Sequence, residues 1–145
     1  MPTRSSKAIW EGTLKEGKGK LIIGNNTWQG SYSAASRFEN ASGTNPEELL
    51  GAAHAGCFSQ AFSMILSQAG YKAEKIETTA RVSIEKQADG FAITRIDLQT
   101  EGIVPGVSEE DFDKYASAAK EGCPVSQLFK GAQITVESKL LQTQQ

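Results

Sequence analysis

The chain has 145 residues, of which 39% are hydrophobic, and a formal net charge of −2 at pH 7. This length can build one sizeable core, so we expect a single domain over residues 1–145. The near-balanced charge, without a basic stripe, argues against a nucleic-acid partner. The sequence shows no apolar signal region near its N-terminus and no uninterrupted apolar run that would span a bilayer. We therefore expect a cytoplasmic protein with no membrane partner.

The first part of the chain predicts β-strands. Residues 7–14 and 19–23 alternate or run apolar around a Lys-Glu-Gly-Lys turn, which is typical of a hairpin. Residues 27–38 are polar and rich in Gly and Ser, and they predict at most a weak strand followed by a loop. Arg37 lies at the end of this segment, where the simplest interpretation is an exposed surface arginine.

Residues 44–70 predict one long helix, around which we expect the rest of the chain to be organised. Asn45 is a suitable N-cap, Pro46 fits the first turn, and Glu48 can complete a capping box. Gly70 supplies the stop. The apolar residues between these ends leave no broad polar face, so protein must cover most sides of this helix.

The remaining sequence predicts strands, two helices and a last strand. Residues 76–85 and 91–101 alternate, and the apolar parity changes within the second segment, which indicates an antiparallel hairpin with a bulge. Ser108 caps an amphipathic helix, and a short helix follows it. Residues 132–140 form the last strand. The pattern predicts an α+β domain in which antiparallel sheet wraps around a long central helix.

The two cysteines are Cys57 and Cys123. In a reducing compartment such a pair can be inert buried thiols, a metal site or a redox pair, and residue type alone leaves these open. Cys123 precedes Pro124 at a predicted helix start, where backbone N–H groups and the helix dipole favour a thiolate or a good leaving group. His54, the only histidine, could join Cys123 and Glu47 in a zinc site, but no paired-ligand spacing supports one.

Very small side chains precede Cys57 in the predicted helix, from Gly51 to Gly56. Each glycine inside a helix costs about 1 kcal/mol relative to alanine, so the close approach of another backbone should compensate. Tight packing of this helix against the sheet explains the same residues nearly as well.

Four segments carry a resemblance to a known family: TNPEELLGAAHAGCFSQAFS, GCPVSQLF, WEGTLKEGKGK and the RFE that begins at Arg37. Together they resemble the OsmC branch of the OsmC/Ohr family of organic hydroperoxide reductases, nearly end to end. The resemblance implies an OsmC-like fold and a thiol peroxidase with no metal or cofactor. It also implies an intertwined homodimer whose long helices lie inside sheets built by both chains.

Carried over residue by residue, the resemblance implies that Cys57 is the peroxidatic cysteine, Cys123 the resolving one, and Arg37 and Glu47 the activating pair. The implied reaction reduces organic and, less efficiently, inorganic hydroperoxides to alcohols in oxidative and osmotic stress defence. It passes through a Cys57 sulfenic acid and a disulfide with Cys123. An external dithiol then reduces this disulfide, and a lipoyl group is one candidate for that dithiol. The guanidinium would keep the thiolate ionised. The apolar residues expected around the site are Phe58, Phe62 and Leu49.

Helix geometry adds one expectation. Glu47 and Cys57 are ten residues apart on one helix, about 15 Å along its axis, so they cannot share a site within one chain. Two copies crossing antiparallel on a twofold axis would meet at position 52, among small residues. We expect Glu47 and Arg37 of one subunit to serve Cys57 of the other. A dimeric module that binds apolar ligands and has structural thiols is the alternative function.

Overall fold

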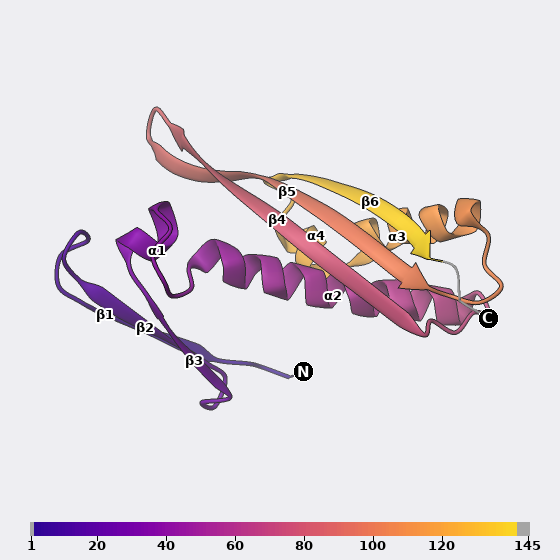
Figure 1. Cartoon of the computed structure of the whole chain (residues 1–145), viewed down its shortest axis with the longest axis horizontal. Helices are drawn as coiled ribbons and strands as arrows, with labels where there is room; N and C mark the ends of the chain where they lie inside the picture. The colour runs from indigo at the N-terminus through magenta and orange to yellow at the C-terminus, as the bar shows by residue number, and fades with distance from the viewer. Residues whose placement is uncertain (1, 142–145) are drawn as a thin grey trace. The chain divides into compact units, whose positions relative to one another are not determined.

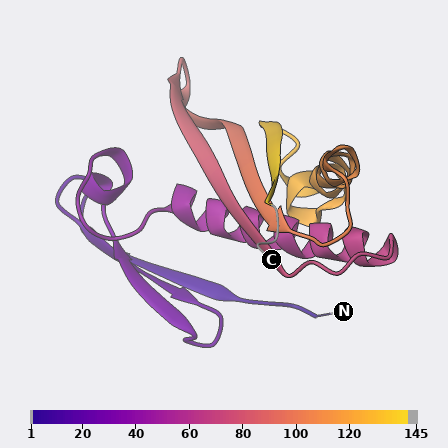
Figure 2. The same cartoon turned by 45° about the vertical axis from the view of Figure 1, so that its right-hand side comes forward.

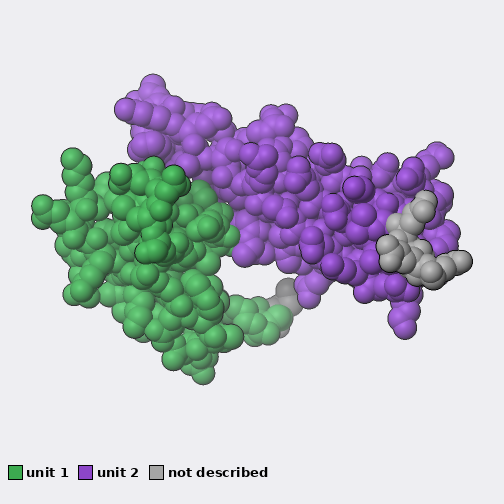
Figure 3. Space-filling view, in the orientation of Figure 1, with its two compact units in different colours: residues 1–49 green, residues 50–145 purple. Residues whose placement is uncertain are grey.

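A computed structural model of the chain describes residues 2–141 (Figure 1). The chain divides into two compact units, one up to Leu49 and one from Leu50 on (Figure 3). The elements are β1 (Ser6–Glu11), β2 (Lys18–Ile23), β3 (Trp28–Tyr32), α1 (Ala34–Phe38), α2 (Pro46–Gln68), β4 (Lys75–Gln87), β5 (Gly90–Ile103), α3 (Glu109–Gly122), α4 (Pro124–Leu128) and β6 (Gln133–Leu141).

The first unit is built on an antiparallel three-stranded sheet in the order β1-β2-β3, which includes the predicted hairpin. Gly19 on β2 pairs with Trp10 on one side and Tyr32 on the other. The two aromatic rings meet over this glycine, with centroids 5.3 Å apart, and a side chain at this position would collide with both rings. Gly19 is therefore required so that the aromatic pair can pack across the sheet.

A short helix, α1, replaces the loop that the sequence predicted before Phe38. Ser33 is its N-cap, and its hydroxyl accepts a hydrogen bond from the Ser36 N–H at 3.0 Å. The Ser36 hydroxyl accepts in turn from the Ser33 N–H at 2.8 Å. This reciprocal capping box satisfies backbone donors that a five-residue helix could not otherwise pair.

The long helix α2 confirms the predicted helix and its start. The Asn45 Oδ1 accepts a hydrogen bond from the Glu48 N–H at 2.8 Å, and the Asn45 amide donates to the Glu48 carboxylate at 2.9 Å. Glu48 is thus occupied at the cap, as predicted.

The second unit contains a sheet in the order β4-β5-β6 (Figures 1 and 2). β4 and β5 form the predicted antiparallel hairpin, and its register shifts between Ser83 and Ile84, which confirms the predicted bulge. β6 pairs with β5 in parallel, however, so the prediction of a purely antiparallel sheet was wrong for this strand. The two helices between β5 and β6 form a crossover, which allows a parallel return that a tight turn would not.

The core of the second unit lies between its sheet and the helices α2 and α3. Phe58 and Phe62 from α2 meet Phe112 from α3, and all three side chains are fully buried. The Phe62 and Phe112 rings have centroids 4.9 Å apart. Burying each such side chain contributes about 1.5–3 kcal/mol, so these rings fix α2 against α3. Ile96 and Leu98 complete this core from β5.

One face of α2 remains exposed within the single chain. Gly51 is buried, and a Cβ there would lie 3.3 Å from the Ala80 carbonyl oxygen, so this glycine serves tight packing against β4. Gly56 has open space around it, and Met64 is 56% exposed. The exposed face is formed by Ala52, Ala53, Gly56, Gln60 and Met64. The predicted cover on most sides is therefore not complete within one chain.

By length and mean hydropathy, α2 also passes a simple test for a membrane span, the one helix among residues 2–141 to do so. Core helices of soluble proteins pass the same test. The buried polar side chain of His54 lies in the middle of α2 and packs within the protein.

Candidate active site

The structure brings the two cysteines together although they are distant in the chain. Cys57 is half-buried on α2, and Cys123 is fully buried between α3 and α4. Both are free thiols, and their sulfur atoms lie 2.9 Å apart. A disulfide bond measures about 2.05 Å, so roughly 1 Å of approach would join the two sulfurs. This contact is the geometric requirement for a redox pair.

The surroundings of Cys57 act on its ionisation in opposite directions. Burial raises the pKa of the Cys57 thiol above its ordinary value, and the contact with the Cys123 thiol raises it further. A hydrogen bond from the Val125 N–H lowers the pKa, because it stabilises a thiolate. The net shift is upward. Within its own unit, the Cys57 thiol is therefore mostly protonated at neutral pH.

The N-terminus of α4 serves Cys57 rather than Cys123, which differs from the prediction. Cys123 occupies the N-cap position, but its side chain makes no capping hydrogen bond. Its sulfur contacts Cys57, and the Val125 N–H in the first turn of α4 reaches the Cys57 sulfur. The predicted helix start is confirmed, but its donor points at the other sulfur.

Arg37 and Glu47 form a close ion pair within the first unit. The Arg37 Nη2 donates to Glu47 Oε1 at 2.8 Å, and Nε lies 3.1 and 3.2 Å from the two carboxylate oxygens. Glu47 is only 7% exposed. Two further hydrogen bonds dock α1 on the start of α2: the Ser36 hydroxyl donates to the Thr44 carbonyl, and the Asn45 amide donates to the Ser36 carbonyl. Arg37 is thus held in a fixed orientation.

An apolar cavity of about 260 Å³ lies beside Arg37 in the first unit. Its lining consists of Trp10, Leu14, Tyr32, Ser33, Ala34, Arg37 and Phe38. Phe58 and Phe62, which the sequence suggested as substrate contacts, are fully buried in the core of the second unit and offer no surface to a ligand. Leu49 is half-buried at the end of the first unit.

His54 occupies a buried position that the sequence left without a role. Its Nε2 lies 2.7 Å from the Ser126 hydroxyl, and its ring meets Phe129 edge-on at 5.5 Å. Its Nδ1 has no partner among the described residues. Burial lowers the pKa of His54, so the imidazole is neutral at pH 7. The spacing of His54 before Cys57 and Ser126 after Cys123, three residues in each case, was the available signal.

Within residues 2–141, no group of three His, Cys, Asp or Glu side chains is arranged to hold a metal ion. Of the residues considered as zinc ligands, Glu47 pairs with Arg37 and His54 with Ser126. Both residues are therefore explained by a contact within the protein: an ion pair for Glu47 and a hydrogen bond for His54.

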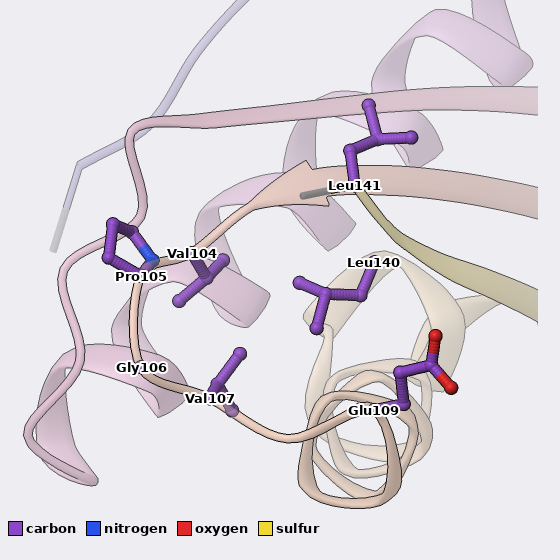
Figure 4. Close-up of a pocket in the computed structure, with 7 residues that line it drawn as sticks. All are labelled: Val104, Pro105, Gly106, Val107, Glu109, Leu140 and Leu141. Carbon is purple, nitrogen blue, oxygen red and sulfur yellow. The ribbon is translucent and has the colours of Figure 1, made fainter. Parts of the chain in front are cut away.

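A larger cavity, of about 380 Å³, lies elsewhere in the second unit. Figure 4 shows its lining: Val104, Pro105, Gly106, Val107, Glu109, Leu140 and Leu141. None of these residues is a cysteine or a predicted site residue. Cavity size therefore does not indicate where the reactive groups of this chain lie.

Comparison with known proteins decides the family. The sequence model of the family described as OsmC-like protein matches residues 39–139. The chain belongs to this family. Peroxiredoxin OsmC of Escherichia coli strain K12 is 48% identical to this OsmC-like chain over 138 residues, which cover 94% of the chain and 96% of the relative. Organic hydroperoxide resistance protein-like 1 of Staphylococcus saprophyticus is 34% identical over 90 residues, 61% of this chain and 63% of that protein.

Solved structures agree on the fold. An OsmC-like protein of unknown function from Vibrio cholerae superposes with a TM-score of 0.76 at 18% identity, covering 95% of this chain and 99% of that one. The organic hydroperoxide resistance protein OhrB of Bacillus subtilis gives a TM-score of 0.68 at 23% identity, with coverage of 94% and 98%. The predicted family and the α+β OsmC-like fold are confirmed.

Proposed function

We propose that this OsmC-like chain is a thiol peroxidase that reduces organic hydroperoxides to alcohols, with Cys57 as the peroxidatic and Cys123 as the resolving cysteine. The peroxidase class is supported by the 48% identity to a peroxiredoxin over nearly the whole of both chains. The observation that carries the residue assignment is the contact of 2.9 Å between the two sulfurs. Inert structural thiols need no such contact.

The proposed reaction has two chemical steps. The Cys57 thiolate attacks the terminal oxygen of ROOH, so that an S–O bond forms, the O–O bond breaks, and the alkoxide leaves and takes up a proton to become ROH. The resulting sulfenic acid condenses with the Cys123 thiol, releasing water and forming a disulfide. An external dithiol, of which a lipoyl group is one candidate, then supplies two electrons by thiol–disulfide exchange.

Ionisation of Cys57 needs a stabilising positive charge, because its surroundings among the described residues of the second unit raise the pKa of the thiol. Burial and the Cys123 thiol raise this pKa by more than the Val125 N–H lowers it. Arg37 is a permanently charged donor held by Glu47. We place this guanidinium beside the Cys57 sulfur of a second copy of the chain, where it lowers the pKa and neutralises the departing alkoxide.

The exposed face of α2 supports the homodimer. Ala52 and Ala53 lie on this face, at the position where two copies related by a twofold axis would exchange Glu47 and Cys57. Small residues allow two helices to approach closely. We propose that a second copy covers this face, that the two units work as one domain in a soluble cytoplasmic dimer, and that each dimer has two composite sites.

The apolar cavity beside Arg37 supports the preference for organic hydroperoxides. An aromatic and aliphatic lining with a guanidinium at its edge suits a substrate with a hydrocarbon body and a polar O–O group. Hydrogen peroxide gains nothing from such a lining, so it should react more slowly.

Thiol titration tests the function. The reduced chain is mixed with one equivalent of tert-butyl hydroperoxide, and free thiols and liberated tert-butanol are measured over time. We expect one alcohol per chain and the rapid loss of both thiols to an intramolecular disulfide. Thiol loss as slow as that of free cysteine would contradict the proposal and favour the binding module.

A mixed dimer tests the composite site. Arg37→Ala and Cys57→Ser chains are coexpressed with different affinity tags, and the dimer that carries both tags is isolated. If Arg37 acts on the partner's Cys57, this dimer has one complete site and about half of the wild-type activity. If the residues act within one chain, the mixed dimer has no complete site and is as inactive as either parent.

A further inference from the structure

The helix α4, which follows the resolving cysteine, is too short to be stable by itself. It has five residues, Pro124–Leu128, and nucleation of so short a helix is unfavourable in water. Ser126 is its buried residue, whereas Leu128 is 76% exposed. The position of α4, and with it that of the Cys123 sulfur, therefore depends on contacts made by this segment with the rest of the second unit.

The Ser126 hydroxyl supplies one such contact, because it lies 2.7 Å from Nε2 of the fully buried His54 on α2. The Phe129 ring at the end of α4 packs edge-on against the same imidazole. In an apolar environment, a hydrogen bond has no competing water, and losing one partner leaves the other unsatisfied. The bond is thus a strong local restraint.

Two links run side by side between the same two segments. One joins the sulfurs of Cys57 and Cys123, and the other joins His54 and Ser126. His54 precedes Cys57 by three residues, nearly one helical turn, and Ser126 follows Cys123 by three residues. The hydrogen bond between His54 and Ser126 therefore holds the two backbones together three residues from each of the reacting sulfurs.

We infer that His54 and Ser126 are positioning residues for closure of the Cys57–Cys123 disulfide: their buried hydrogen bond holds α4 on α2, so that the Cys123 sulfur stays within reach of Cys57. Neither residue touches the substrate in this role. The inference deepens the proposed function, on which its meaning for turnover rests, but the contact itself can be tested without any peroxide.

The test is the thiol–disulfide equilibrium of the intact chain in a buffer of reduced and oxidised dithiothreitol. Two protein thiols are oxidised to one disulfide while one oxidised dithiothreitol is reduced, so atoms and electrons balance. The equilibrium constant reports how well the fold holds the two sulfurs together. For Ser126→Ala we expect a constant about tenfold lower than that of the wild type.

Ser59→Ala is the matched control. Ser59 lies on α2 two residues after Cys57, and its hydroxyl bonds Thr78 on β4 at 2.7 Å. This variant removes a comparable hydrogen bond near Cys57 without loosening α4. Its equilibrium constant should equal that of the wild type, which separates positioning from general destabilisation.

Substitutions of His54 provide a second readout if Ser126→Ala folds poorly. Glutamine places its amide nitrogen near the position of Nε2, whereas asparagine places it near Nδ1. Since the observed bond uses Nε2, His54→Gln should stay within about threefold of the wild type, and His54→Asn should show about the tenfold loss. Ser126→Thr keeps the hydroxyl and should restore the wild-type value.

An equilibrium constant for Ser126→Ala within about threefold of the wild type would overturn the inference. An equal effect of His54→Gln and His54→Asn would overturn it as well. In contrast, a wild-type chain that fails to react with tert-butyl hydroperoxide, while Ser126→Ala still shifts the dithiothreitol equilibrium, would refute the peroxidase and leave the positioning role established.

Discussion

Residues 2–49 hold the charged groups of the proposed reaction, whereas residues 50–141 hold its sulfurs. The first unit contains the Arg37–Glu47 ion pair with an apolar cavity beside it and has no cysteine. The second contains Cys57 and Cys123 in contact, and burial raises the pKa of the Cys57 thiol. Each arrangement is already formed within its own unit. The two proposed steps therefore have separate structural requirements. Oxidation of Cys57 needs a cation, and formation of the disulfide with Cys123 needs contact between the two sulfurs.

The two units also differ in how they are stabilised. The second has a core of fully buried aromatic and aliphatic side chains. In the first, several large apolar side chains are exposed, among them Ile9, Leu14 and Trp28. No residue of its three strands is fully buried, so its sheet contributes little core of its own. This difference fits a first unit that gains cover from a second copy of the chain.

Loss of the nucleophile should have the largest effect. Cys57→Ser should lower peroxidase turnover at least about 10⁴-fold, because a hydroxyl at neutral pH does not replace a thiolate. Turnover is measured from alcohol release with dithiothreitol as reductant. In the absence of added thiol, Cys123→Ser should undergo one rapid oxidation per chain and stop at a sulfenic acid that dimedone traps, whereas the wild type should stop at a disulfide that dimedone does not label. A wild-type chain that dimedone labels as strongly as Cys123→Ser would contradict the resolving role.

Removal of an aromatic ring should destabilise the protein more when the ring comes from the core of the second unit than when it comes from the first unit. Phe62→Ala should lower the free energy of unfolding by about 3–5 kcal/mol, because it leaves a cavity where the Phe62 ring packs against Phe112, between α2 and α3. Trp10→Ala, which removes a half-buried ring in the first unit, should cost less. Urea unfolding at a fixed protein concentration measures both. A larger loss for Trp10→Ala would reverse our ranking of the two units.

Removal of the guanidinium should slow the first oxidation and leave closure intact. Arg37→Ala should lower the rate of sulfenic acid formation about 10²-fold, because the thiolate and the leaving alkoxide both lose a charged donor. Glu47→Gln should have the same direction with a smaller effect, since it loosens Arg37 without removing it. Stopped-flow oxidation, with the dithiothreitol equilibrium as a control, checks this. A wild-type oxidation rate in Arg37→Ala would refute the assigned activation.

The smallest expected effect is a decrease in the free energy of unfolding at acid pH, caused by the buried His54. Because burial lowers its pKa in the folded chain, only the unfolded chain takes up a proton as the pH falls below about 6.5. Stability is therefore full above that pH and decreases below it, by at most about 1.4 kcal/mol per pH unit from this group. Urea midpoints between pH 7 and 5 measure the slope. His54→Gln should flatten it, and an unchanged slope would exclude His54 as its source.

The local elements and the family were predictable because their causes lie within short segments. Asn45 with Glu48 and Ser108 with Asp111 mark helix starts by side chains that reach only three residues along the chain. Alternation predicted the hairpin of β4 and β5 with its bulge. The homodimer, the reductant and the catalytic roles of the four site residues remain predictions.

Where the sequence reading was wrong, two signals had been present. Ser33 and Ser36 carry a capping pattern that indicates α1, although the Gly- and Ser-rich segment suggested a loop. The strand–helices–strand order from β5 to β6 indicates a parallel return, because a crossover long enough to include helices can come back in the same direction.

The sequence by itself determined the helices α2, α3 and α4 and most strands of this chain, its two cysteines and its family, because caps, periodicity and motifs act over a few neighbouring residues. The resemblance implied that Glu47 acts with Arg37, but only the tertiary structure showed the hydrogen bonds between them, the donation from Val125 to Cys57 and the contact of His54 with Ser126. These contacts depend on how α1, α2 and α4 dock. Docking follows from the packing of whole faces, which no single segment specifies.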